Sequence, residues 1–202
     1  IFLFKNNEVS QYDKFTNEYL PSSESNIDEF TYIKKSSKNK NFIFHYKPNK
    51  IEDLANDLYT QSIFENIEKD DEIQKIIDTL SKEVHESFYI NKTINKGIVY
   101  IHAKMPNIIK EYLEYQFSQI DKFKYIIANS VILEGINLPI DNLYIMSTDY
   151  QNGKDLVNLI GRVNRLNYVF KEKKLNKLIS NIHFVSTEKY QGDNDMKNKD
   201  RK

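Results

Sequence analysis

The chain has 202 residues with 40% hydrophobic and 13% aromatic content, so it is long enough to bury the core of one domain. Its 29 basic and 29 acidic residues cancel, which excludes binding of nucleic acid through net charge and leaves only a local patch for that role. The absence of cysteine excludes disulfide bonds and thiolate metal sites and favours a reducing compartment, the cytoplasm. No apolar run approaches the roughly 20 residues that span a bilayer, so we expect no membrane association.

Residues 1–39 have the composition of a linker. A short apolar start is followed by the polar stretches PSSESNIDE and KKSSKNKN. The chain begins at Ile1, inside an apolar group, rather than at a methionine. We therefore expect a linker or lead-in from a preceding lobe.

From Lys40 onward, short apolar runs alternate with segments of helical period. Strands are predicted at 41–46, 97–102, 124–129, 142–148 and 181–186, and helices at 51–64, 71–88, 106–120 and from about Asp155. Strands that are apolar on both faces and separated by helix-length segments predict a parallel sheet covered by helices. The predicted class is α/β, with one domain over residues 40–187 and a disordered tail over residues 188–202.

The segment NLIGRVNRLN, residues 158–167, holds two of only three arginines in the chain. On the helix predicted from Asp155, the side chains of Asn158, Arg162 and Arg165 fall three or four residues apart and so share one face. A planar, always charged guanidinium grips phosphate or carboxylate in a way that lysine does not. The alternative is an ordinary amphipathic helix whose arginines pair with acidic residues of a neighbour.

A polar block precedes this helix. The residues ANSVILEGINLP, at 128–139, follow a predicted strand and end in Gly-x-Asn-x-Pro. Open α/β sheets bind ligands in loops at the carboxyl ends of their strands. Gly135 permits close approach to the backbone, and Asn129, Ser130 and Asn137 offer polar groups to phosphate or ribose. A plain turn is the alternative, since one glycine and one proline are weak evidence.

Taken in chain order, NFIFHYKPNK, HAKM, ANSVILEGINLP and NLIGRVNR resemble the motifs of the second RecA-like lobe of superfamily 2 helicases. The resemblance covers about residues 40–187, and the Gly-x-Asn-x-Pro ending is most similar to the group that includes the Ski-type enzymes. It implies a RecA-like (P-loop NTPase-like) parallel sheet flanked by helices. It also implies part of an ATP-dependent helicase that acts on RNA or DNA.

By this resemblance, Arg162 and Arg165 are arginine fingers that reach ATP held by another lobe. A guanidinium delivered to the γ-phosphate accelerates phosphoryl transfer by about 10³ to 10⁵. Gly135, Asn137 and Asn158 are implied on the nucleotide side.

The resemblance implies contacts to the nucleic-acid backbone for residues at the strand ends and in the polar block: Tyr46, Lys47, His102, Lys104, Asn129 and Ser130. Read by itself, a lone histidine at a strand end is more often a satisfied structural residue than a ligand. Three residues depart from the motifs. Glu134 stands where arginine is common, Asn158 replaces a glutamine, and Asn164 replaces a glycine.

Two motifs are missing. The chain contains neither Gly-x-x-x-x-Gly-Lys-[Ser/Thr], which cradles a triphosphate, nor an Asp-Glu box for magnesium. We therefore expect ATP and Mg²⁺ to be held mainly by an N-terminal RecA-like lobe of the same parent chain, and the fragment alone to be inactive. The four histidines lack metal-ligand spacing, so no intrinsic metal is expected. A duplex-DNA translocase of a restriction or defence system and an inactive RecA-like scaffold remain alternatives.

Overall fold

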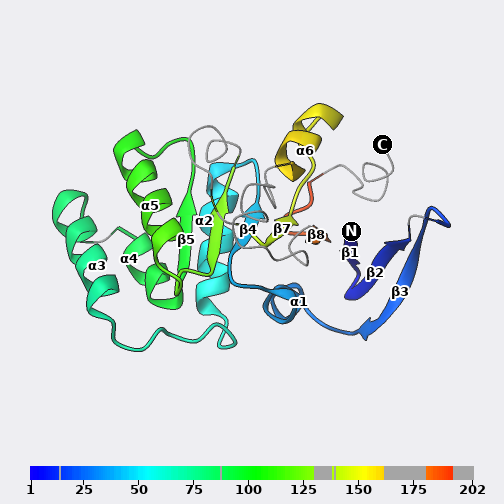
Figure 1. Cartoon of the computed structure of the whole chain (residues 1–202), viewed down its shortest axis with the longest axis horizontal. Helices are drawn as coiled ribbons and strands as arrows, with labels where there is room; N and C mark the ends of the chain where they lie inside the picture. Colours follow the sequence, from blue (N-terminus) through cyan, green and yellow to red (C-terminus); the bar gives the residue numbers. More distant parts are fainter. Residues whose placement is uncertain (14, 87, 130–137, 139, 162–180, 193–202) are drawn as a thin grey trace, which may run out of the picture.

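A computed structural model describes residues 1–13, 15–86, 88–129, 138, 140–161 and 181–192. Its strands form one sheet in the order β3-β2-β1-β8-β7-β4-β6-β5 (Figure 1). The strands are β1 (Phe2–Lys5), β2 (Glu8–Asp13), β3 (Glu18–Ser25), β4 (Asn41–Phe44), β5 (Ile98–Ile101), β6 (Tyr125–Ala128), β7 (Asn142–Ile145) and β8 (Asn181–Ser186). The helices are α1 (Glu29–Ser36), α2 (Pro48–Thr60), α3 (Asp71–Glu83), α4 (Ile90–Thr93), α5 (Asn107–Gln119) and α6 (Gly153–Ile160), with a 3₁₀ turn η1 (Ile94–Lys96).

The centre of the sheet is parallel. Strands β5, β6, β4, β7 and β8 pair side by side in the same direction, and each lies within a range predicted from the sequence. Four of these strands, β4 to β7, are buried at every residue, as expected of a sheet covered on both faces. The α/β class with a RecA-like parallel sheet is confirmed.

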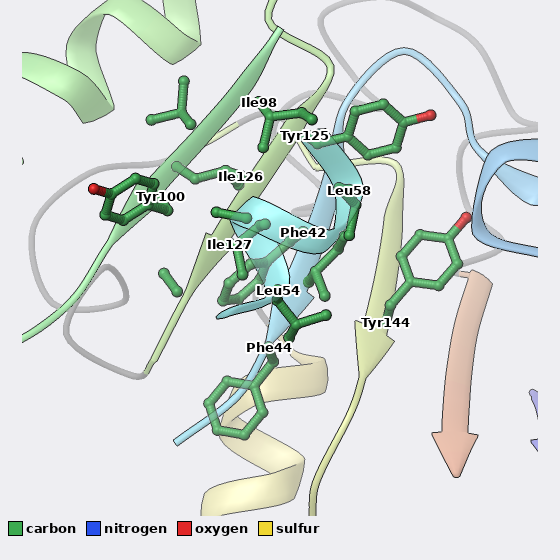
Figure 2. Packing of buried hydrophobic residues seen from close by; sticks show 14 of the residues in the cluster. Phe42, Phe44, Leu54, Leu58, Ile98, Tyr100, Tyr125, Ile126, Ile127 and Tyr144 are labelled. Atoms are coloured by element: carbon green, nitrogen blue, oxygen red, sulfur yellow. The ribbon is translucent and has the colours of Figure 1, made fainter. Parts of the chain in front are cut away.

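The helices begin where capping residues satisfy their free N–H groups. Asp70 accepts hydrogen bonds from the backbone of Glu72 and Ile73 at the start of α3, and Asn152 forms a capping box with Asp155 at α6. Helix α2 starts at a proline, which the first helical turn tolerates. Figure 2 shows Leu54 and Leu58 of α2 among buried side chains of β4, β5 and β6, so this helix seals one face of the sheet.

The N-terminal region differs from the expected linker. Strands β1, β2 and β3 form an antiparallel meander, and β1 pairs in parallel with β8, so residues 2–25 extend the central sheet (Figure 1). Asn6 and Asn7 join β1 to β2 with φ of 53° and 62°, the left-handed values that a tight hairpin turn requires and that asparagine tolerates. The polar composition of residues 1–39 therefore reflects turns, an exposed sheet edge and the exposed side of helix α1. Whether a further lobe precedes them remains a prediction.

The tail predicted to be disordered, residues 188–202, is ordered over its first five residues. Residues 188–192 continue a turn after β8 in which the Tyr190 amide donates to the Thr187 carbonyl at 3.2 Å. The Tyr190 side chain is only 1% exposed. One buried aromatic ring thus fixes a segment whose composition is otherwise that of a polar tail.

Lys40 is a buried cation at the opposite end of the sheet from the strand ends considered below. Its Nζ donates hydrogen bonds to the carbonyls of Phe117, Ile120 and Phe123 at 2.7, 2.6 and 2.8 Å. These carbonyls lie in the last turn of α5 and just after it, where helical partners run out. Burial lowers the pKa of Lys40 to about 8. One side chain therefore ties the end of α5 to the start of β4.

Glu114 of α5 makes the stability of the chain depend on pH. The side chain is buried, and burial raises the pKa of its carboxyl from 4.5 to about 7. Because the folded state holds this proton more tightly than the unfolded state, its contribution to the free energy of unfolding falls as pH rises from 4.5 to about 7. We expect Glu114→Gln to raise the free energy of unfolding by about 1–3 kcal/mol at pH 8 and to leave it nearly unchanged at pH 4.

Urea unfolding at both pH values measures this difference. Glu83→Gln, at an exposed position on α3, is the matched control and should change little. An equal rise in the free energy of unfolding for Glu114→Gln at pH 4 and pH 8 would contradict the raised pKa of Glu114. The rise would then come from packing and not from ionisation of the carboxyl.

Candidate functional site

The carboxyl ends of β4, β5, β6 and β7 lie along one edge of the sheet, because these strands are parallel. Each is followed by polar residues: 45–47 after β4, 102–104 after β5, Asn129 after β6 and 147–150 after β7. This is the edge at which open α/β sheets bind ligands. The structure thus places at one edge the predicted site residues Tyr46, Lys47, His102, Lys104 and Asn129.

His45 is the support of the β4 end. Its ring is 2% exposed, its Nδ1 accepts from the Lys47 amide at 3.0 Å, and its Nε2 lies 3.1 Å from the Tyr190 carbonyl. Since a carbonyl oxygen only accepts, Nε2 carries the hydrogen. Burial lowers the pKa of His45 to about 4, so the ring is neutral at pH 7. His45 is not among the site residues predicted from the sequence.

Tyr46 and Lys47 form the outer surface of the β4 end. The Tyr46 ring stacks on His45 with centroids 5.1 Å apart, and the exposed Lys47 places its Nζ 5.2 Å from the centre of the Tyr46 ring. The neighbouring Tyr46 hydroxyl raises the pKa of Lys47, which therefore stays charged at pH 7. A cation beside an aromatic ring suits a phosphate next to a planar group.

His102 points inward at the β5 end. Its Nε2 lies 2.8 Å from a carboxylate oxygen of Glu52 on α2, and its ring stacks on Tyr100. Burial lowers the pKa of His102, and the Glu52 carboxylate opposes that shift. The contact predicted between His102 and the nucleic-acid backbone would compete with the bond to Glu52. Lys104, by contrast, is exposed. Both assignments remain predictions.

The loop after β7 is braced by the segment after β8. Ser147 Oγ donates to the Gln191 carbonyl at 3.1 Å and accepts from the Asp149 amide at 3.2 Å. Gly192 has φ of 70°, and a Cβ on it would overlap the buried Asp149 carboxylate. Glycine is needed here for both its conformation and its lack of a side chain. The loop therefore has a fixed path up to Tyr150.

Helix α6 presents Asn158 to solvent while Leu156 and Leu159 are buried. This agrees with the first part of the amphipathic helix predicted from Asp155, but α6 ends at Ile160, so Gly161 is its C-cap and not an interior residue. The remaining candidates lie outside the described residues, either in the gap at 130–137 or beyond Gly161. They are Ser130, Gly135, Asn137, Arg162 and Arg165, together with Glu134 and Asn164.

Two features are absent from the residues that the structure describes. No group of three or more His, Asp or Glu side chains gathers there in a way that could hold a metal ion. None of the helices in that part of the chain has the length and apolar character needed to cross a membrane.

Comparison with known proteins gives one family match. The family described as the helicase conserved C-terminal domain matches residues 49–167, which is more than half of the chain. No curated protein sequence matches. Among solved structures, the crystal structure of the E. coli DEAD-box protein SrmB bound to regulator of ribonuclease activity A is similar at 12% identity with a TM-score of 0.43. That similarity covers 78% of this chain and 66% of that one, so this chain spans slightly less than two thirds of it.

Proposed function

Because the chain belongs to the family of helicase conserved C-terminal domains, we propose that it is the second RecA-like lobe of an ATP-dependent superfamily 2 helicase that acts on RNA or DNA. The observation that carries this proposal is the family match itself. It spans the carboxyl ends of β5, β6 and β7, helix α6 and the segment with the paired arginines. This chain would be one of the two RecA-like lobes of the helicase, and an N-terminal RecA-like lobe of the same parent chain would be the other.

In this proposal Arg162 and Arg165 serve as arginine fingers. Asn158, which belongs to the same sequence motif, is exposed on α6, and this supports the proposal. Gly135, Asn137 and Asn158 stand on the nucleotide side. When bound, ATP with Mg²⁺ supplies the phosphoryl group that is transferred to water.

The triphosphate and the metal ion are assigned to the other lobe, because this chain has no phosphate-binding loop sequence. What this lobe's own residues contribute is positive charge and orientation. Charge fixed in place before the reaction stabilises the transition state without the cost of reorganising solvent.

Nucleic acid is proposed to lie along the carboxyl edge of the sheet. Lys47 and Lys104 are exposed there, Tyr46 is half-buried beside Lys47, and Asn129 and His102 are buried behind them. Ser130 is assigned to the same surface from its motif alone. Contacts from lysine and from amide or hydroxyl groups to phosphate and sugar hold a strand without reading its sequence. The affinity of the complete enzyme for nucleic acid should therefore fall as salt concentration rises.

Phosphate release tests the proposed function. We expect the parent protein with both lobes to hydrolyse ATP faster when single-stranded nucleic acid is added, and the 202-residue chain to show no turnover with or without it. A parent without turnover would favour an inactive scaffold. Turnover by the chain alone would contradict the assignment of the triphosphate to another lobe.

A further inference from the structure

Two tyrosines from separate strand ends meet at the carboxyl edge of the sheet. Tyr46 follows β4 and Tyr150 follows β7, and their ring centroids are 5.1 Å apart with the planes at 54°. Tyr150 is 84% exposed, so most of its ring gains nothing from burial. Its φ is 56°, in the left-handed region that bulky residues rarely adopt. An exposed aromatic ring on a strained backbone indicates a position kept for contact.

The pair is held in place from below. His45 stacks under Tyr46 at an interplanar angle of 14°, and the Tyr190 carbonyl fixes the His45 ring through Nε2. Gly192 allows the Asp149 carboxylate to sit against the segment after β8, immediately before Tyr150 in the chain. Both rings therefore rest on the same braced segment. A surface ordered before binding loses less conformational entropy when a ligand arrives.

The charges beside the two rings favour an anionic ligand. Lys47 lies over Tyr46 and is exposed, and none of the ion pairs between described residues involves it. Lys50 lies one helical turn further along, paired with Asp53 at 3.5 Å. The other carboxylate nearby, Asp149, is 6% exposed and faces Gly192. The accessible charge next to the rings is therefore positive.

A planar ring attached to a phosphate matches both features, because each base of a single strand carries a π-face and a neighbouring phosphate. We propose that the exposed ring of Tyr150, supported by the tilted ring of Tyr46, forms a ledge on which an unpaired base of single-stranded nucleic acid stacks, with Lys47 against the adjoining phosphate. The ledge rests on the proposed function and deepens it, because it adds contact with base faces to contact with the sugar-phosphate backbone. Such stacking tolerates any base.

Binding of a fluorescently labelled oligothymidylate to the 202-residue chain at low salt tests the ledge. Removal of a stacking ring costs about 1–3 kcal/mol per base, so Tyr150→Leu should weaken binding about 5- to 100-fold, whereas Tyr150→Phe keeps a ring and should bind nearly as wild type. The matched control is Tyr115→Leu, which removes a 56% exposed tyrosine from α5 and should not change the affinity.

A second variant reports the contact directly. The chain has no tryptophan, so Tyr150→Trp gives it a single one, whose emission should be quenched when oligothymidylate stacks on it. Wild-type affinity in Tyr150→Leu would overturn the ledge and leave the helicase proposal standing. Quenching by ATP and not by the oligonucleotide would overturn it too, by assigning the ring to the nucleotide. If the wild-type chain bound no oligonucleotide, the proposed nucleic-acid surface would fail along with the ledge.

Discussion

Replacement of Arg162 or Arg165 by lysine is expected to lower the ATP turnover of the two-lobed parent protein by about 10³- to 10⁵-fold. Lysine keeps the positive charge but replaces a planar fork of donors with a compact ammonium group on a flexible stem. If the role is to meet the oxygens of a γ-phosphate in the transition state, geometry matters as much as charge. The measurement is kcat for ATP at saturating nucleic acid.

The third arginine of the chain provides the control. Arg201→Lys makes the same chemical change outside the family match and should leave kcat unchanged. The thermal unfolding of each variant shows whether it is folded. Wild-type kcat in both Arg162→Lys and Arg165→Lys would mean that these arginines pair with acidic residues in a structural role, the alternative that an amphipathic helix leaves open.

Lys40→Met is expected to lower the free energy of unfolding by about 2–4 kcal/mol. Methionine has a similar length and retains the packing of the stem, but it donates no hydrogen bond to the carbonyls of Phe117, Ile120 and Phe123. The Ile120 carbonyl keeps a hydrogen bond from the Phe123 amide at 3.1 Å, so the main cost comes from the carbonyls of Phe117 and Phe123, at about 1–3 kcal/mol each. Methionine also removes the cost of burying a charged ammonium group, and this gain offsets part of the loss in the free energy of unfolding.

Urea unfolding of the 202-residue chain at pH 7 measures this loss. Lys38→Met, two residues earlier at an exposed position, is the matched control and should change the free energy of unfolding by less than about 0.5 kcal/mol. If Lys40→Met and Lys38→Met had the same free energy of unfolding, the carbonyls at the end of α5 would not need the lysine as a hydrogen-bond donor, and the buried cation would be dispensable.

The strands and helices between Lys40 and Ser186 were largely predictable because local pattern and tertiary environment agree there. Strands β4 to β7 are buried along their whole length, so their sequences are uninterrupted apolar runs. The N-terminal meander lacks this signal. Strand β2 buries only Val9 completely, so its alternation is weak, and the Asn6–Asn7 pair was the one local indication of a hairpin.

The candidate site was predictable in its position but not in its orientation. The parallel sheet brings Tyr46, Lys47 and Asn129 to one edge, as expected from their places at or just after the ends of predicted strands. That His102 turns toward Glu52 depends on how α2 crosses the sheet, which no local pattern records.

Long-range support was likewise hidden from the sequence. The His45 ring is held by a carbonyl 145 residues later, in a segment whose composition suggested disorder. Tyr150 could have been noticed as an aromatic residue directly after a predicted strand. The exposure of its ring and its positive φ could not have been predicted from the sequence.

The position of β8 between β7 and β1 sets an order on folding. Phe2 pairs with His183, so β1 is synthesised long before its parallel neighbour β8 exists. During that time the meander of β1 to β3 offers an open strand edge to other nascent chains. Pairing across such a sequence distance is also slow, because the loop must close before any contact stabilises it. Completion of the sheet therefore depends on six residues, Asn181–Ser186, the last of the described strands in chain order.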